Sequence, residues 1–322
     1  MRIDGVFVAV DAPRDVVYVL RALGLGDLLT AVPALRGLRR HFPDCRIVLA
    51  APSQYRGLAL FTGAVDELAP TAQLGDVRQL DRFPALAVNL HGSGPQSMDH
   101  LLRLAPTALL SHRHPLHANL AGPPWRPDLH EVDRWCILLD WAGIASDPDD
   151  LFIDRPDGHP DRRGVVVVHP GAAASARRWP AKRFAEIAAA LHDDGHEVVV
   201  TGSTAERGLA LEVAAAAGLA ESAVLAGTLD LLALVALISD CELLICGDTG
   251  VGHVATATAT PSVLLFGPTP PSRWGPRDSG RHLALWAGDV GDPHGDRPHA
   301  GLLLLTASDV LDATRSMLGR CA

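Results

Sequence analysis

The chain has 322 residues, of which 48% are hydrophobic and 20% charged, and its formal net charge is −9. A chain of this length is about twice a common domain size, so we expect two domains, each with a sizeable core. The composition excludes a disordered or fibrous protein. The acidic balance, without a long basic run, argues against nucleic acid and anionic membrane as the main partner.

Cysteine usage and hydropathy bear on the compartment. Five cysteines without a Cys-x-x-Cys pair are typical of reduced, mostly buried thiols. The N-terminus lacks a signal-peptide pattern, and the longest uncharged stretch, residues 249–272, is too rich in Gly, Pro and Thr for a membrane helix. We therefore expect a cytoplasmic protein whose contact with a membrane is at most peripheral.

The first half of the chain alternates apolar runs with helical patterns. Strands are predicted at residues 16–20, 46–50 and 85–90, and helices from the turn at 24–27 to about residue 41 and at 133–142. Residues 111–130 are rich in His and Pro and predict an irregular loop.

A polar segment separates the two halves. Residues 154–164, DRPDGHPDRRG, contain Pro and Gly, as interdomain linkers often do, so we expect an N-terminal domain over residues 1–155 and a C-terminal domain over 164–322. In the second half, strands are predicted at 165–168, 197–201, 223–225, 243–246 and 262–266, and helices at 181–193, 204–217, 230–240 and 308–318. The last of these helices could cross back to the first domain.

Strands that alternate with helices predict an α/β fold with parallel sheets. Two Rossmann-like halves joined by a short linker would face each other across a cleft. Ligands of open parallel sheets bind outside the carboxyl ends of the strands. The loops that directly follow strands are therefore the candidate sites.

One such loop follows the strand at 165–168. It reads HPGA over residues 169–172 and leads to RRWP over 177–180, at the start of a helix. A glycine turn with free backbone N–H groups and a guanidinium suits a phosphate, because arginine offers a planar fork of donors. The alternative is a plain strand–helix connection in which Pro180 opens the helix and the arginines are solvated.

A second loop, CGDTGVGH over residues 246–253, follows the strand at 243–246. Its glycines allow a tight turn that brings N–H groups to an anion at the positive end of a helix. Asp248 could cap that helix or accept hydrogen bonds from sugar hydroxyls. His253 is either a polar anchor for a ligand or a helix histidine with a purely structural role.

Two loops of the first half are weaker candidates. The turn GLGD over residues 24–27 is not a Gly-x-Gly-x-x-Gly motif, which disfavours a nicotinamide dinucleotide. Asp27 could cap the following helix or take a proton from an acceptor hydroxyl. The turn HGSG over residues 91–94 could line an acceptor site or simply turn the chain. The histidines of the 111–130 loop have no carboxylate partner at metal-ligand spacing, so no metal site is expected.

Three sequence blocks taken together are specific. The order GLGDLLTAVPAL, then HPGA with RRWPAKRF, then GDTGVGHVATA with PSVLLFGPTPPSRWGP resembles the heptosyltransferase family, glycosyltransferase family 9, over nearly the whole chain. The resemblance implies the GT-B fold, whose first domain binds mainly the acceptor and whose second binds mainly the sugar nucleotide. It also implies an inverting enzyme with no metal ion and no cofactor, since the ADP-sugar is a co-substrate.

The same resemblance implies roles for single residues. Asp27 matches the family's proposed general base. Arg177 stands where the family usually has a lysine that contacts the donor diphosphate, and the backbone amides of Thr249 and Gly250 match those that hold the phosphates. Asp248 matches a contact to the donor sugar.

Further site residues follow less directly. His253 belongs to the same motif as Asp248, and Glu206, in a Gly-x-x-x-Glu pattern that starts at Gly202, would bind the ribose or the base region. Gly26 and Gly171 are expected among the donor-binding residues. His91 and Ser93 are expected on the acceptor side.

We therefore expect an enzyme that transfers a heptose-like sugar from an ADP-sugar to an acceptor hydroxyl with inversion. The acceptor is a lipopolysaccharide-type glycan by resemblance, with a small natural product as the alternative. Two other functions stay open: a GT-B transferase that uses a different nucleoside diphosphate sugar, and a sugar-nucleotide-binding protein without catalysis. Retention of both Asp27 and the 247–253 loop argues against the loss of catalysis.

Overall fold

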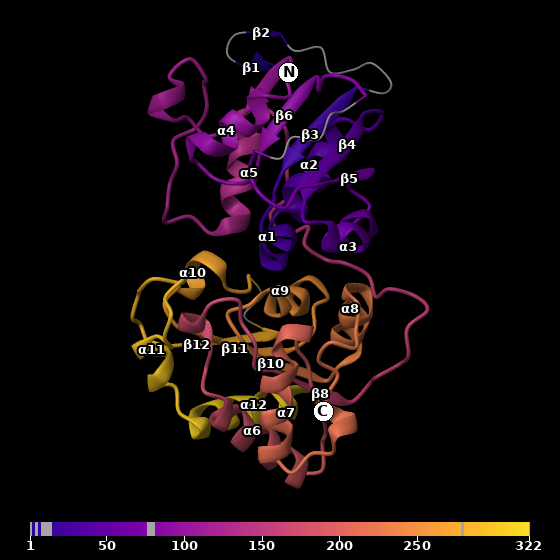
Figure 1. Ribbon diagram of the computed structural model, residues 1–322, viewed down its shortest axis with the longest axis vertical. Helices are drawn as coiled ribbons and strands as arrows, with labels where there is room; N and C mark the ends of the chain where they lie inside the picture. Colours follow the sequence, from indigo (N-terminus) through magenta and orange to yellow (C-terminus); the bar gives the residue numbers. More distant parts are fainter. Residues whose placement is uncertain (1, 4–5, 8–14, 76–80, 278–279, 322) are drawn as a thin grey trace. The chain divides into compact units, whose positions relative to one another are not determined.

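The computed structural model describes residues 2–3, 6–7, 15–75, 81–277 and 280–321. The chain divides into two compact units, Met1–Leu151 and Phe152–Ala322 (Figure 1). The boundary precedes the linker predicted at residues 154–164. Each unit contains one five-stranded sheet in which all strands run parallel.

The sheet of the first unit has the strand order β5-β4-β3-β6-β7. Its members are β3 (Val16–Leu20), β4 (Arg46–Ala51), β5 (Glu67–Pro70), β6 (Leu86–Asn89) and β7 (Ala108–Leu110). The central strand β3 is buried along its whole length, as a continuous apolar run flanked by parallel neighbours requires. The predicted strands are confirmed, and β5 and β7 are additional.

Helices connect these strands: α1 (Leu25–Thr30), α2 (Val32–His41), α3 (Arg56–Phe61), α4 (Pro95–Leu102) and α5 (Glu131–Trp141), with short 3₁₀ turns η1 (Ser53–Tyr55) and η2 (Pro115–His117). The one helix predicted from the turn at 24–27 to residue 41 is two helices, separated at Ala31. Pro33 explains the break, because proline has no N–H to continue the first helix but fits the first turn of the next. A short antiparallel pair, β1 (Arg2–Ile3) and β2 (Val6–Phe7), precedes the sheet.

The sheet of the second unit has the order β12-β11-β10-β8-β9. Its members are β8 (Val165–His169), β9 (Glu197–Val200), β10 (Leu243–Gly247), β11 (Ser262–Phe266) and β12 (His282–Trp286). The strand predicted at 223–225 is wrong as a full strand, since only Val224 forms a single parallel bridge, to Val200. The 3₁₀ turn η5 (Glu221–Ala223) occupies most of that segment.

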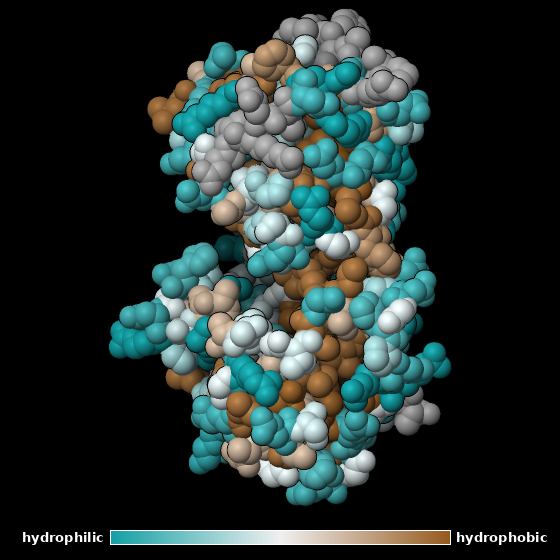
Figure 2. Space-filling view, turned by 45° about the vertical axis from the view of Figure 1, so that its right-hand side comes forward, coloured by the Kyte–Doolittle hydropathy of each residue, from teal (hydrophilic) through white to brown (hydrophobic). Residues whose placement is uncertain are grey.

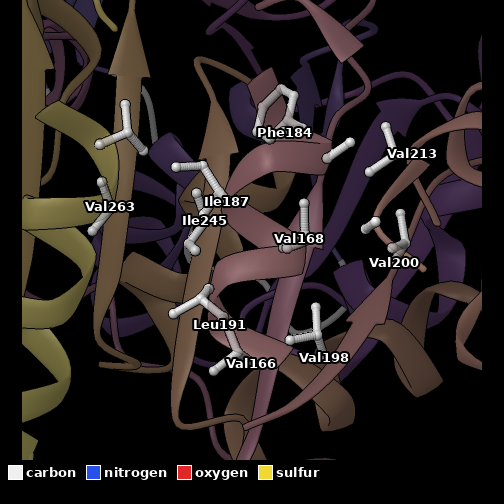
Figure 3. Close-up of a cluster of buried hydrophobic side chains, with 14 of the residues drawn as sticks. Val166, Val168, Phe184, Ile187, Leu191, Val198, Val200, Val213, Ile245 and Val263 are labelled. Carbon is white, nitrogen blue, oxygen red and sulfur yellow. The ribbon is translucent and has the colours of Figure 1, made fainter. Parts of the chain in front are cut away.

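The helices of the second unit are α6 (Ala181–Asp193), α7 (Arg207–Ala216), α8 (Leu231–Asp240), α9 (Gly250–Ala257), α10 (Pro271–Trp274), α11 (Ala300–Leu304) and α12 (Ala307–Cys321), with 3₁₀ turns η3 (Ser175–Arg177) and η4 (Thr204–Glu206). Figure 3 shows how α6 covers the sheet: Phe184, Ile187 and Leu191 pack on the valines of β8 and β9.

The last helix, α12, packs in the second unit against α6 and β11. Its residues Val310, Met317 and Leu318 are buried in the core of that unit. The expectation that this helix also packs back on the first domain stays a prediction. Its apolar positions are spaced to line one face, and the sheet of its own unit offers the apolar partner.

Both five-stranded sheets reverse their strand order beside the first strand of the sheet. In the first unit the chain moves outward from β3 to β5 and then returns to β6, on the other side of β3. In the second unit the corresponding point lies between β8 and β10. Ligands of such sheets bind where the order reverses, outside the carboxyl ends of the strands. The loops after β3, β6, β8 and β10 are therefore placed for function.

No helix among the described residues is long and apolar enough to cross a membrane. Hydrophilic side chains cover much of the surface visible in Figure 2, and hydrophobic side chains reach it in places, as in most folded proteins.

Candidate active site

The loop after β8 packs against a carboxylate from the loop after β9. A Cβ placed on Gly171 would meet the carboxylate of Glu206, so a larger residue there would require the Glu206 side chain to move. Oε2 of Glu206 accepts hydrogen bonds from the backbone N–H and the hydroxyl of Ser203, both at 2.8 Å. Burial alone would raise the pKa of this carboxyl, but the hydrogen bonds from Ser203 hold the pKa below its usual value. Two of the predicted residues, Gly171 and Glu206, thus lie together.

Arg177 joins the loop after β8 to the loop after β10. It ends η3, and its Nη1 donates to the backbone oxygen of Asp248 at 3.1 Å. Its Nε is buried and has no hydrogen-bond partner within the part of the chain that the structure describes. A buried donor without a partner is costly, and an anionic ligand would satisfy it with a charge-assisted bond.

Asp248 directly follows β10, and its side chain is buried. Burial raises the pKa of the carboxyl to about 6, although the charge of Arg177 and a hydrogen bond from Thr269 act in the opposite direction. Asp248 does not cap α9, because the residue at the N-cap is Thr249. A buried carboxylate at a strand end, with a raised pKa, is typical of a functional site rather than of a helix cap.

The N-terminus of α9 adds a second positive element. Thr249 is extended at the N-cap, and its hydroxyl makes no capping bond to the helix. The N–H of Gly250, the first residue of the helix, lies at its positive end, whereas the N–H of Gly252 donates to the backbone oxygen of Thr249. Gly252 lets this helix approach the sheet, since a Cβ there would lie 3.1 Å from Leu264.

One pocket of the second unit opens beside this helix end. It is lined by residues that include Asp248, Thr249 and His253, together with Phe266, Trp274 and Pro276. The rings of His253 and Trp274 meet edge to face with their centroids 5.8 Å apart. The structure thus brings three of the predicted residues into one pocket. Trp274, which lies in the quoted block SRWGP, was not singled out from the sequence.

His169 is the last residue of β8 and directly precedes the loop that contains Gly171. It is buried, and its Nδ1 lies 3.0 Å from the hydroxyl oxygen of Thr201. Burial lowers the pKa of its imidazole to about 4. His169 is thus neutral at neutral pH and acts as a packed polar residue under the site.

In the first unit Asp27 lies in the first turn of α1. Its Oδ2 accepts a hydrogen bond from the N–H of Gly24 at 3.1 Å, which stabilises the helix start. Its Oδ1 lies 3.1 Å from Nη2 of Arg21, and a quarter of the side chain stays exposed. The helix-capping role is therefore real, and the exposed part of the carboxylate leaves room for a second one. Gly26 is buried one position before Asp27.

Arg21 is the charged residue at this site that the sequence reasoning missed. It directly follows β3 and is 1% exposed. Its Nη2 lies 2.9 Å from Oε1 of Glu131, the first residue of α5, which is also buried. The signal was present in the sequence, since Arg21 follows a buried strand by one residue, but a single arginine after a strand is most often solvated.

His91 and Ser93 lie in the loop after β6, on the far side of β3 from β4. Nδ1 of His91 is buried without a hydrogen-bond partner among the described residues. Burial and, next, the charge of Arg21 lower the pKa of His91 to about 4. Arg21 therefore faces both Asp27 and His91. Ser93 is half-buried in the same loop.

The 111–130 segment is irregular, as predicted, and it packs through aromatic residues. His112 is buried, with its ring edge to face with Trp125 and Trp135, and burial lowers its pKa to about 4. Nδ1 of His112 lies 3.3 Å from the backbone oxygen of Pro123. Within the described ranges no group of His, Cys, Asp and Glu side chains is arranged to hold a metal ion.

The family model of glycosyltransferase family 9 (heptosyltransferase) matches residues 142–286. Lipopolysaccharide heptosyltransferase 2 of Escherichia coli K12 is 34% identical over 351 residues, covering 94% of this chain and 98% of the relative. The chain belongs to glycosyltransferase family 9. As a member of that family it is a glycosyltransferase, which confirms the resemblance read from the three sequence blocks.

Solved structures of family 9 enzymes share the fold. The E. coli ADP-heptose lipopolysaccharide heptosyltransferase II matches with a TM-score of 0.74 at 22% identity, covering 94% of this chain and 98% of that one. An E. coli heptosyltransferase with ADP-2-deoxy-2-fluoro heptose matches with a TM-score of 0.69 at 16% identity, covering 94% and 99%. The α/β architecture with two parallel five-stranded sheets is thus that of the GT-B heptosyltransferases, as predicted.

Proposed function

We propose that this glycosyltransferase moves a heptose from ADP-heptose to a hydroxyl of a lipopolysaccharide-type core glycan, with inversion at the anomeric carbon. The oxygen of the acceptor forms the new bond to that carbon while the bond to the phosphate oxygen of ADP breaks. ADP leaves with the electron pair, and a base takes the proton of the acceptor hydroxyl. The names of the relatives, which are lipopolysaccharide heptosyltransferases, support this choice of donor and acceptor.

The observation that carries the proposal is the buried Nε of Arg177, which lacks a partner among the described residues next to the N-terminus of α9. A guanidinium and the first N–H groups of a helix both attract a diphosphate. Thr249 and Gly250 supply those N–H groups at the point where the strand order of the sheet reverses. Arg177 replaces the family's usual lysine and keeps its charge, and its planar fork can bind two phosphate oxygens.

The residues around that diphosphate would bind the donor sugar and the nucleoside. Asp248 and His253, which line the pocket beside α9, would bind hydroxyls of the sugar. Glu206, which packs on Gly171, would bind the ribose or the base region. Gly26 remains a donor-binding proposal on the strength of the Gly-Asp motif alone.

Asp27 is the base in this proposal. It is a partly exposed carboxylate in the first turn of α1, which follows the first strand of its sheet, and its remaining lone pairs can accept a proton from an acceptor hydroxyl. His91 and Ser93, in the loop after the neighbouring strand β6, would line the acceptor side. The reaction needs no cofactor beyond the ADP-sugar itself, since the positive groups that stabilise the leaving diphosphate come from the protein.

Two assays test the proposed function. Thermal shift with ADP, GDP and UDP, each with and without EDTA, measures the nucleotide, because a ligand at 100 times its dissociation constant stabilises a protein by about 2.7 kcal/mol. Release of ADP from ADP-heptose, with truncated lipopolysaccharide core as acceptor, measures transfer. We expect ADP to stabilise most and EDTA to leave transfer unchanged.

Other outcomes would contradict parts of the proposal. Stronger stabilisation by GDP or UDP would assign another donor, and loss of transfer with EDTA would overturn the metal-free diphosphate site. Binding of ADP-heptose without release of ADP to any acceptor would point to a protein that binds the sugar nucleotide without catalysis.

A further inference from the structure

A single nitrogen atom of Arg21 bridges two carboxylates in the first unit. Nη2 of Arg21 lies 3.1 Å from Oδ1 of Asp27 and 2.9 Å from Oε1 of Glu131. The first carboxylate is the proposed base and is a quarter exposed, whereas the second is nearly buried. The charge of Arg21 is therefore shared between a carboxylate that faces solvent and one that does not.

The rest of the Arg21 side chain is fixed by the backbone. Nε donates to the backbone oxygen of Asp27 at 2.9 Å, and Nη1 donates to the backbone oxygen of Leu90 at 2.5 Å. The guanidinium also lies over the ring of Trp135, 4.8 Å from its centroid. These contacts come from α1, from the loop after β6 and from α5. The guanidinium is thus held from three elements and has little freedom to move.

Glu131 is the reason that such a guanidinium can be buried. Its Oε1 accepts from Arg21 and from the indole N–H of Trp135, and its Oε2 accepts from Arg134 at 3.0 Å. Burial would raise the pKa of Glu131, but the charges and hydrogen bonds of the two arginines hold it below its usual value. Glu131 therefore stays ionised and compensates much of the charge of Arg21.

We propose that Arg21 is the positioning residue of the reaction. Arg21 fixes the carboxylate of Asp27 through Oδ1, and Glu131 compensates the buried positive charge of Arg21. This inference rests on the proposed role of Asp27 as the base. Oδ1 of Asp27 is in an ion pair with Arg21 and Oδ2 accepts from the N–H of Gly24, so both carboxylate oxygens are held while a quarter of the side chain stays exposed.

The test is a double-mutant cycle on kcat, measured as ADP release from ADP-heptose with truncated lipopolysaccharide core. Arg21→Met is made in the wild-type chain and in the Asp27→Asn chain. In the wild-type chain we expect kcat to fall by about 10- to 100-fold, because a misplaced catalytic group costs up to that much, while the KM for ADP-heptose changes by less than about twofold. In the Asp27→Asn chain the same change should lower kcat by less than about twofold, because no base is left to position.

Arg134→Met is the matched control. Arg134 is buried, as Arg21 is. It pairs with Oε2 of Glu131, whereas Arg21 pairs with Oε1, and it does not contact Asp27. It should lower the unfolding temperature as Arg21→Met does and leave kcat within about threefold, since it acts on stability alone. Where Arg21→Met does not fold, Arg21→Lys replaces it in the same cycle. Guanidinium ion at millimolar concentration should restore part of the kcat of Arg21→Ala.

Two results are distinguishable. If Arg21→Met lowers kcat by the same factor in both chains, Arg21 acts independently of Asp27 and the inference is overturned, while the proposed base stands. If Asp27→Asn by itself leaves kcat unchanged, the base assignment of the proposed function fails, and the inference fails with it.

Discussion

Nη1 of Arg177 donates to the backbone oxygen of Asp248 at 3.1 Å, which ties together the two loops that flank the reversal of strand order in the second sheet. The bond leaves Nε of the same guanidinium buried and without a partner among the described residues. A cation in that position is held by the fold yet retains donors for a ligand. This pairing is the structural basis for a diphosphate site at the start of α9.

Replacing Arg177 tests that site directly. Arg177→Ala should weaken ADP binding by about 1.5–3 kcal/mol, or roughly 10- to 150-fold, because a charge-assisted hydrogen bond is lost. Arg177→Lys should keep most of the affinity, since the charge remains. Isothermal titration calorimetry measures both. Lys182→Ala, an exposed cation on neighbouring α6, is the control and should bind ADP as the wild type does.

The raised pKa of Asp248 predicts that this carboxylate lowers the stability of the ligand-free protein although the activity requires it. The pKa of this carboxyl in the folded protein is about 6, above the usual value of 3.8. The buried carboxylate therefore destabilises the ligand-free protein increasingly as the pH rises from 3.8 to about 6, and by its full amount above that. Asp248→Asn should therefore raise the unfolding free energy at pH 8 by about 1–3 kcal/mol, since each unit of pKa shift is worth about 1.36 kcal/mol. It should also lower kcat/KM for ADP-heptose. At pH 5 the gain should be about half as large, because the folded carboxyl is then mostly protonated whereas that of the unfolded chain is still ionised, and a gain of equal size at both pH values would contradict this assignment.

Two buried histidines, His112 and His169, and the half-buried His91 contribute to the acid stability. The folded pKa values of His91, His112 and His169 are all about 4, below the 6.5 of the unfolded chain, so the unfolded state binds more protons between those values. Stability is therefore full above pH 6.5 and is lost as the pH falls toward 4. Asp248 acts in the opposite direction below pH 6, which leaves a net uptake of about two protons on unfolding.

The unfolding temperature should accordingly fall steadily from pH 7 to pH 5. His112→Phe removes one of the three groups and keeps an aromatic ring against Trp125 and Trp135, so its profile should be flatter. An unfolding temperature that is constant over this range would show that these imidazoles are protonated in the folded state.

Asp27 tests the proposed chemistry. Asp27→Asn keeps the shape of the side chain and removes the base, so kcat should fall at least about 100-fold while the affinity for ADP-heptose stays within about twofold. Asp140→Asn, an exposed carboxylate on α5 of the same unit, is the control and should be unchanged. An Asp27→Asn enzyme with near-normal kcat would leave Asp27 as a helix-capping residue only.

The sequence predicted most of the sheet and the loops that carry the candidate site. The valine run of β8 and the glycines of residues 247–252 are local signals, because each is read within a few residues. The strand predicted at 223–225 was wrong because strand pairing depends on distant residues rather than on a local pattern. Its apolar residues suit a strand, but Val224 has only one bridging partner, Val200, and pairing depends on residues far away in the chain.

The missed residues share a physical cause. Arg21 directly follows a buried strand, which is a weak local signal, but its burial depends on the pairing with Glu131, which is 110 positions away. Trp274 lies in the third sequence block that resembles the heptosyltransferase family. Its contact with His253 depends on how α10 packs beside α9. Charge and ring contacts between distant segments require the fold to be known first.

The most direct test of the central claim is the stereochemistry of the transfer. The product made from ADP-heptose and truncated lipopolysaccharide core is isolated, and the one-bond coupling between C1 and H1 of the transferred sugar gives its anomeric configuration by NMR. The account predicts a configuration opposite to that of the donor, since one displacement with base assistance from Asp27 inverts the carbon. A product with the donor's configuration would contradict it.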